Sequence, residues 1–222
     1  MRQGLVTLVV VLAAVAAAPV QAAPTAYDQA FVDAFAAACV PGRLSYGTSL
    51  GAAVSAGWVP VDPEAHAELA AVMDLAVEEA LAAEEDLDEL SFFFEAFAKQ
   101  IEGVTHHLVI SRSSAVIGDR HEPINPWVFV GCHLYNFDAT APLDPQPVTA
   151  LIGNAISRTE QSEGQISHVW GPPCPMPRTG DSYLSFVAEG SPAATIVPFT
   201  GVALNFSTSE LDVGEPVPDP YC

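Results

Sequence analysis

One short segment, Gly47-Thr48-Ser49-Leu50-Gly51, matches the G-x-S-x-G pattern of serine hydrolases. In those enzymes the serine sits on a tight turn between a strand and a helix, where its hydroxyl is exposed. A helix is expected to follow here, but residues 40–46 are too few and too polar for the preceding strand. Asp138 and His168 have the chain order that a catalytic triad with Ser49 requires. Ser49 is therefore a candidate nucleophile, and the alternative is that the motif only begins a helix.

The histidines give no compact metal-binding motif. The chain lacks H-E-x-x-H, and the adjacent His106 and His107 lie in a predicted strand, where neighbouring side chains point to opposite faces. A site assembled from distant residues would draw first on His121, Glu122, His133 and Asp138. We predict packed or solvated histidines instead, with no metal and no cofactor.

The four cysteines are Cys39, Cys132, Cys174 and Cys222. Their number is even and there is no C-x-x-C, which argues for disulfides rather than a zinc or thioredoxin-like motif. Three pairings are possible. We favour Cys39–Cys132, which would join the helical part to the sheet, and Cys174–Cys222, which would hold a proline-rich tail against a proline-rich loop.

Residues 1–22 have the features of a secretory signal peptide. Arg2 precedes an apolar run over residues 5–15, and Val20-Gln21-Ala22 is a small-residue cleavage site. We expect cleavage after Ala22 and export to the periplasm or the extracellular medium, which are compartments where disulfides form. The apolar run is too short to span a bilayer, so no membrane span is predicted.

The charge of the chain restricts its partners. There are 7 Lys and Arg against 27 Asp and Glu, a formal net charge of −20. Nucleic-acid binding requires a basic surface and is therefore not expected. The same argument disfavours anionic lipid surfaces. The general interpretation of this acidity is that it keeps the protein soluble or adapts it to salt. The more specific interpretation is that it forms a surface that binds cations or basic ligands.

The N-terminal third is predicted to be helical, over about residues 25–83. Thr25 and Asp28 form a capping pattern, and apolar residues recur every four positions until Pro41-Gly42 ends the helix. A second helix is expected over residues 45–56. Asp62-Pro63 is expected to begin a third, with a buried stripe of Leu69, Val72, Met73, Ala76, Ala80 and Leu81.

The remainder, about residues 90–207, is predicted to be mainly strands. Residues 90–101 keep a helical spacing but are rich in aromatics, and Glu102-Gly103 favours a hairpin with residues 104–111. Further strands are expected over 127–137, 165–170, 182–188 and 201–206, with one helix over 145–157. The fold class is therefore α+β: N-terminal helices, then a mainly antiparallel sheet of about six strands with one inserted helix. We expect one domain over residues 23–213 and a proline-rich tail over 214–222.

Three segments resemble small exported proteins of alphaproteobacteria: residues 53–58 (AVSAGW), 130–139 (VGCHLYNFDA) and 198–204 (PFTGVAL). The shared pattern consists of hydrophobic residues, glycines and one cysteine, without a catalytic signature. The resemblance implies export and an α+β fold. It implies no activity and no site residues.

The function that follows from these observations is a binding role. No group of residues in the sequence requires a catalytic role. We therefore predict a non-enzymatic binding or interaction protein of the cell envelope, with a protein as one possible partner. The alternative is a serine hydrolase that uses Ser49.

Overall fold

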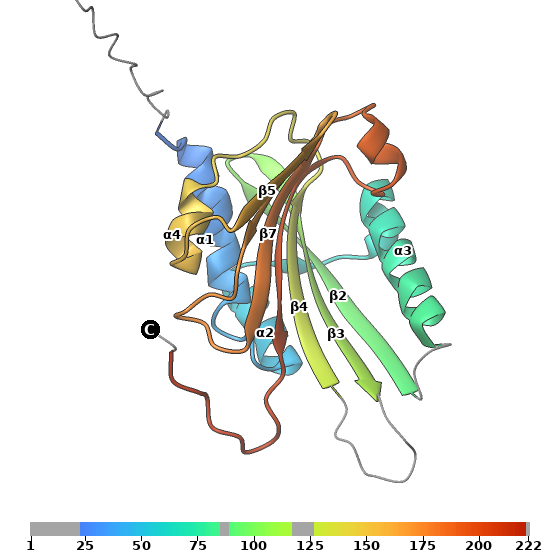
Figure 1. The fold of residues 1–222 in the computed structure, drawn as a ribbon. Helices are drawn as coiled ribbons and strands as arrows, with labels where there is room; N and C mark the ends of the chain where they lie inside the picture. Colours follow the sequence, from blue (N-terminus) through green and yellow to red (C-terminus); the bar gives the residue numbers. More distant parts are fainter. Residues whose placement is uncertain (1–22, 85–88, 117–126, 221–222) are drawn as a thin grey trace, which may run out of the picture.

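The computed structural model describes residues 23–84, 89–116 and 127–220. The described chain forms one open antiparallel sheet of eight strands with helices on both faces (Figure 1). The strand order is β1-β2-β3-β4-β8-β7-β6-β5. The strands are β1 (Val59–Pro60), β2 (Glu89–Ile101), β3 (Val104–Val116), β4 (Trp127–Asn136), β5 (Arg158–Ser162), β6 (Gln165–Trp170), β7 (Thr179–Val187) and β8 (Gly201–Ser209).

The described α-helices are α1 (Ala26–Cys39), α2 (Tyr46–Ser55), α3 (Ala67–Glu84) and α4 (Gln146–Ile152). Two short 3₁₀ helices, η1 (Pro63–Ala65) and η2 (Pro192–Thr195), complete the set. The α+β class predicted from the sequence is therefore correct. The signal peptide, His121, Glu122 and Cys222 lie outside the described residues, so those predictions stay predictions.

Helices α1, α2 and α4 lie on one face of the sheet, and α1 forms where the sequence predicts it. Its first turn is closed by the expected capping box, in which the Thr25 hydroxyl accepts from the Asp28 amide and the Asp28 carboxylate accepts from Thr25. Of the predicted stripe of Tyr27, Phe31, Phe35 and Cys39, the last three are fully buried against the sheet and Tyr27 is partly buried. Burial of such a stripe supplies most of the stability of a surface helix.

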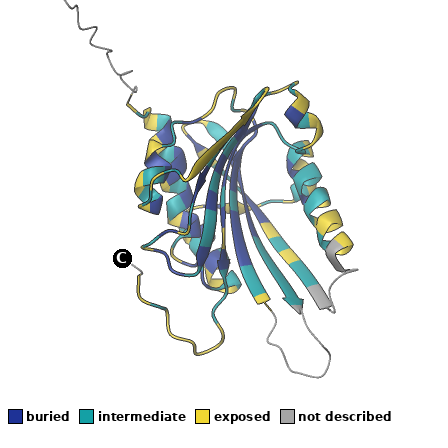
Figure 2. Cartoon of the chain, viewed as in Figure 1, coloured by how far each residue is buried: buried dark blue, intermediate teal, exposed yellow. Residues whose placement is uncertain are grey.

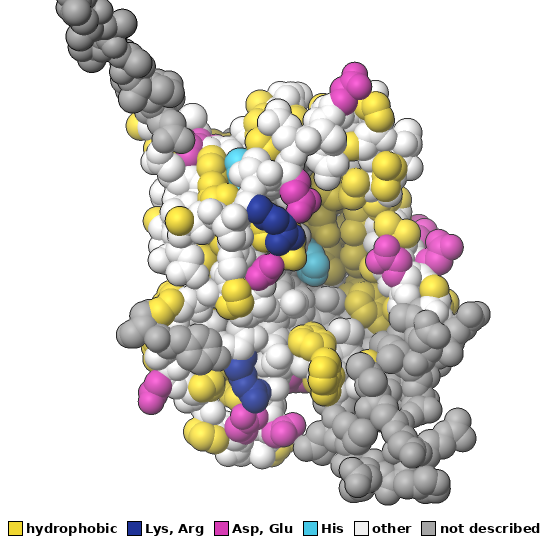
Figure 3. All heavy atoms as spheres, in the orientation of Figure 1, with side chains coloured by type: hydrophobic (Ala, Val, Ile, Leu, Met, Phe, Trp, Pro, Cys, Tyr) yellow, Lys and Arg dark blue, Asp and Glu magenta, His cyan; other side chains and the backbone are white. Residues whose placement is uncertain are grey.

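Helix α3 lies on the opposite face of the sheet, on the same side as the short η2 (Figure 1). Leu69 and Met73, in its first half, pack with Val109, Tyr135 and Ala203 of the sheet. The second half of the expected stripe is not buried: Leu81 is 61% exposed. Figure 2 shows the resulting change from buried to exposed residues along the helix. An apolar hollow beside α3 is visible in Figure 3.

The aromatic segment before Glu102 is a strand, so the predicted hairpin is confirmed. Residues Glu89–Ile101 pair with Val104–Val116 in one uninterrupted register. Glu102 and Gly103 both have positive φ, 49° and 82°, as a two-residue type I′ turn requires. The β-branched and aromatic content of these residues therefore outweighs their helical spacing.

Three details of the prediction were wrong. The described sheet has eight strands, whereas about six were predicted; the prediction missed β1 and β5. All five residues of β5 are exposed, so it has no alternating pattern to detect. The inserted helix ends at Ile152 rather than residue 157, since Gly153 adopts the left-handed conformation that caps it. Residues Pro63–Ala65 form a 3₁₀ turn, and α3 begins only at Ala67.

Two glycines allow close packing around β4. Gly201 has φ +85°, and a Cβ there would lie 2.1 Å from the Asn136 carbonyl oxygen. A Cβ at Gly131 would lie 2.5 Å from Ser111 Oγ and 2.9 Å from His133 Nε2. Both positions therefore exclude a larger side chain without movement of a neighbour.

Candidate functional site

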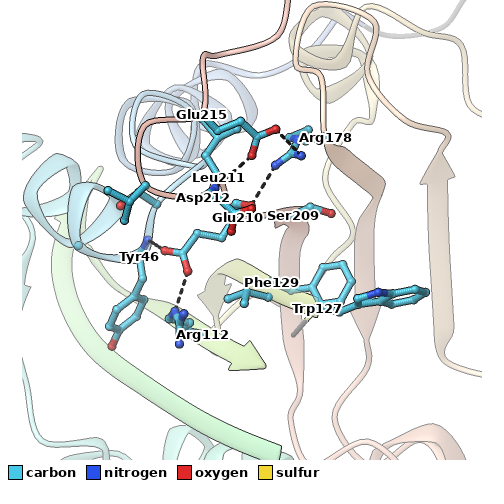
Figure 4. Close-up of a pocket in the computed structure, with 14 residues that line it drawn as sticks. Tyr46, Arg112, Trp127, Phe129, Arg178, Ser209, Glu210, Leu211, Asp212 and Glu215 are labelled. Carbon is cyan, nitrogen blue, oxygen red and sulfur yellow. Dashed lines mark hydrogen bonds and ion pairs between the residues drawn. The ribbon is translucent and has the colours of Figure 1, made fainter. Parts of the chain in front are cut away.

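A cavity of about 840 Å³ lies at the end of the sheet beneath the start of α2 (Figure 4). Its wall is formed by the N-terminus of α2, by residues of β3 and β4, and by the chain that leaves β8. The lining residues are Ser45, Tyr46, Gly47, Arg112, Trp127, Val128, Phe129, Arg178, Ser209, Glu210, Leu211, Asp212, Val213 and Glu215. We call it the arginine–glutamate cavity. Its volume falls within the range of small-molecule binding sites.

Glu210 connects two parts of the wall. Its Oε2 accepts a hydrogen bond from Arg112 Nε at 2.7 Å, and its Oε1 accepts one from the Tyr46 amide at 2.7 Å. The Arg112 and Glu210 side chains are 31% and 15% exposed, so this ion pair is screened less than a surface pair. Glu210 also supplies a partner to one of the unpaired amides at the start of α2. The carboxylate therefore fixes β3, α2 and the chain after β8 relative to one another.

Arg178 holds the outer wall. Its guanidinium donates to the Glu210 carbonyl at 3.0 Å and to Glu215 Oε1 at 2.8 Å. The Asp212 amide donates to the other oxygen of Glu215 at 3.1 Å, which closes the turn after β8. Two backbone bonds, from the Leu211 amide to the Leu44 carbonyl and from the Glu210 amide to the Val128 carbonyl, secure the same segment. The wall is thus fixed by hydrogen bonds rather than being a loose tail.

The cavity offers a ligand both apolar surface and hydrogen-bonding groups. Trp127 is 59% exposed, whereas Trp58 and Trp170 are 2% and 0% exposed. The Nη groups of Arg112 have no hydrogen-bond partner among the described residues. Two arginines and three acidic residues line the cavity, so its formal charge is −1. This arrangement favours an uncharged ligand over an anion.

The candidate nucleophile Ser49 lies outside this cavity. It is buried in α2, and its hydroxyl donates to the Gly42 carbonyl oxygen at 2.8 Å. A turn, rather than a strand, precedes the helix. The packing is tight there, since a Cβ on Gly42 would lie 2.6 Å from the Ser49 backbone. The hydroxyl proton is therefore engaged with a carbonyl rather than a base, which gives Ser49 a structural role in this geometry. Of the G-x-S-x-G motif only Gly47 lines the cavity.

The cysteines follow the favoured pairing as far as they are described. Cys39 of α1 and Cys132 of β4 form a disulfide in the core, so this prediction is confirmed. Cys174 is also disulfide-bonded, and no described cysteine is free. Its predicted partner, Cys222, lies outside the described residues.

Several of the described histidines lie on or beside the sheet. Desolvation lowers the pKa of His133 to about 4. Sequence reasoning missed a pair at a smaller cavity of about 310 Å³: the rings of His66 and His107 are 4.6 Å apart, beside Asp62 and Asp138. Burial, and then the neighbouring His66 and His106, lower the pKa of His107 to about 4. In the described part of the chain, no three His, Cys, Asp or Glu side chains are arranged to hold a metal ion.

Comparisons with known proteins do not assign this chain to a family. No family model matches the chain, and neither the curated proteins nor the solved structures contain a match. Among the described helices, none has both the length and the apolar character to cross a bilayer. The candidate function therefore depends on the geometry of the site alone.

Proposed function

We propose that this chain is an exported, non-enzymatic binding protein whose ligand occupies the arginine–glutamate cavity. The observation that carries the proposal is the cavity itself: about 840 Å³, with walls fixed by ion pairs and with an exposed indole at its margin. Export is supported by the predicted signal peptide and by the disulfide between Cys39 and Cys132.

The ligand that best suits this cavity is a small neutral molecule with an aromatic or apolar part and hydrogen-bonding groups. Trp127 and Phe129 supply apolar surface. The unpaired Nη groups of Arg112 supply donors, while the positive charge of Arg112 is already balanced by Glu210. An anion would meet a cavity of charge −1 on a chain of charge −20.

Trp127 provides a direct assay. Because Trp58 and Trp170 are buried, quenching of tryptophan fluorescence by acrylamide reports mainly on Trp127. We expect a neutral aromatic ligand, selected by thermal shift from a metabolite library, to protect Trp127 from acrylamide and to raise the melting temperature. The Trp127→Phe variant should keep the thermal shift but lose the protection from quenching.

A matched pair of arginine variants locates the ligand. Arg112→Lys keeps the charge but removes the planar fork, so it should weaken binding several-fold. Arg158→Lys alters an exposed arginine on β5 that contacts Glu160, and it should leave binding unchanged. A selected ligand that binds both variants as it binds the wild type, with Trp127 still open to acrylamide, would contradict the proposed site.

A further inference from the structure

A second cavity lies near the start of strand β3, on the face of the sheet that α3 covers. It has a volume of about 310 Å³, and we call it the histidine cavity. Its lining residues are Val61, Asp62, Ala65, His66, Thr105, His107, Phe137 and Asp138. None of them lines the arginine–glutamate cavity. His107 precedes Arg112 by five positions on β3, which is about 17 Å along the strand, so the two cavities are separate.

The histidine cavity is assembled from distant parts of the sequence. Thr105 and His107 belong to the start of β3, and Phe137 and Asp138 follow the last residue of β4. Because β3 and β4 are antiparallel neighbours, these four residues meet at the same end of the sheet. The other lining residues come from the chain between β1 and α3, which includes η1. His66 of this segment packs over the corner, with its ring centroid 4.6 Å from that of His107 and 4.7 Å from that of Phe137.

The side chains of His66 and His107 have no hydrogen-bond partner among the described residues. The Nδ1 atom of each is buried and unpaired, and His107 is only 7% exposed. The adjacent His106, in contrast, has a partner for both ring nitrogens, in the Tyr27 hydroxyl and the Val104 carbonyl. Native proteins rarely leave buried polar groups unpaired. A half-turn of an imidazole exchanges its nitrogen and carbon positions, so each ring can direct a nitrogen toward a ligand in the cavity.

The charge of the histidine cavity is negative. Asp62 and Asp138 line it and no Lys or Arg does, so its formal charge is −2 with the histidines neutral. His107 is uncharged at neutral pH, because burial lowers its pKa to about 4. One oxygen of Asp62 accepts a hydrogen bond from the Glu64 amide at 3.1 Å, whereas the Asp138 carboxylate has no partner among the described residues. The cavity therefore combines negative charge with hydrogen-bond acceptors that the described chain leaves open.

We propose that the histidine cavity binds the primary ammonium group of a small organic amine. Such a group has a positive charge and three N–H donors, which match the two carboxylates and a neutral imidazole of the cavity. Val61, Ala65 and Phe137 supply apolar surface for a short carbon chain. The net charge of −20 on the chain also attracts cations to its surface. This assigns part of the acidity of the sequence to a specific site, independent of the ligand in the arginine–glutamate cavity.

Other classes of ligand suit the cavity less well. An anion would meet two carboxylates. A quaternary ammonium ion carries the charge but has no N–H donors, so it would leave the imidazoles unpaired. A metal ion is disfavoured because, among the described residues, no three His, Cys, Asp or Glu side chains are arranged to hold one.

Proton NMR of the histidine rings tests the proposal, with butylammonium as the probe at neutral pH. We expect saturable shifts of the ring signals of His66 and His107, while those of His168, which is hydrogen-bonded to Thr159 on β5, stay unchanged. Butanol lacks the charge and tetramethylammonium lacks the donors, so at equal ionic strength neither should reproduce these shifts. No saturable shift with butylammonium, or the same shifts with tetramethylammonium, would overturn the proposal. Binding of Zn²⁺ by the two histidines without binding of butylammonium would overturn it as well.

A matched pair of aspartate variants locates the ammonium group. Asp138→Asn removes one carboxylate of the cavity, and it should weaken butylammonium binding by about tenfold, as the loss of a charge-assisted hydrogen bond does. Asp74→Asn makes the same change in net charge at an exposed position of α3 outside the cavity, and it should bind as the wild type does. His107→Phe keeps a ring but removes both nitrogens; it identifies the His107 signal and should also weaken binding. Equal affinities of the two aspartate variants for butylammonium would refute the site.

Discussion

Removal of the Cys39–Cys132 disulfide should produce a large and calculable loss of stability. The two cysteines are 93 residues apart, so the bond closes most of the N-terminal half of the described chain into one loop. On the chain-entropy relation a loop of this length stabilises the folded state by about 4.7 kcal/mol at 25 °C. For a chain of 222 residues this corresponds to a melting temperature lower by about 10 °C in the Cys39→Ala/Cys132→Ala variant.

The measurement must separate the bond from the buried sulfur atoms and from the disulfide of Cys174. We would measure the free energy of unfolding in urea for the wild type and the double variant, each with and without reductant. The loss on reduction in the wild type minus the loss in the variant contains only the Cys39–Cys132 bond, because the other bond is reduced in both. This double difference should be about 4–5 kcal/mol.

A double difference under about 1 kcal/mol would refute the entropic argument. It would mean either that the bond is absent from the purified protein or that the unfolded chain is already compact between Cys39 and Cys132. The slope of the urea transition distinguishes these explanations, since a compact unfolded state lowers it. Thiol titration of the unreduced wild type gives a direct check on the bond.

Three further predictions concern stability. Gly201→Ala should lower the free energy of unfolding by about 2 kcal/mol or more, because φ is +85° and the new Cβ would lie 2.1 Å from the Asn136 carbonyl oxygen. Gly51→Ala is the control: it lies in a helix with open space around it, and it should raise the free energy of unfolding by up to about 1 kcal/mol in the same urea titration. Ser49→Ala should cost about 0.5–1.5 kcal/mol, because it removes one buried hydrogen bond while the Gly42 carbonyl keeps its bond from the Ser45 amide. A fluorophosphonate probe should label neither form, and labelling that disappears in the variant would restore the hydrolase hypothesis. His107 is 7% exposed and its pKa is about 4 in the fold against 6.5 ordinarily, so protonation favours the unfolded chain. Its contribution to stability is complete above about pH 6.5 and falls by up to about 3 kcal/mol as the pH drops from about 6.5 to about 4. His107→Phe should reduce the pH dependence by this share, and the share of His133, whose pKa is also about 4, should remain.

The fold was predicted best where a repeating pattern coincides with burial. The four-residue repeat from Phe31 to Cys39 and the Glu102-Gly103 turn are local signals, and both were confirmed. The missed strands have no such signal. β5 is entirely exposed, and β1 has two exposed residues, so neither shows alternation between a buried and a solvated side.

The candidate site could not be predicted because it is assembled by topology. Arg112 and Glu210 are 98 residues apart in the sequence. They meet because β8 lies between β4 and β7 in the sheet, which brings the end of β8 close to β3. No short motif records that order. A weak signal was nevertheless present: the chain has only 7 Lys and Arg, and Arg112 directly follows the predicted strand over residues 104–111. The Ser49 motif was the stronger pattern, yet a helix and a backbone carbonyl account for it.

The bond between α1 and β4 also affects how the protein withstands cleavage. Helices α2 and α3 and strands β2 and β3 all lie between Cys39 and Cys132, so a protease that nicks any of the intervening peptide bonds leaves two fragments still covalently joined. Such a nicked molecule would migrate as one species on a non-reducing gel and as two after reduction. A cut between Cys132 and Cys174 would instead give two fragments that the Cys39–Cys132 bond does not join. Under the predicted Cys174–Cys222 pairing, a cut beyond Cys174 would again leave its fragments linked. The segment between β4 and the loop before β7 is therefore expected to be the part of the chain where a single cut separates the molecule.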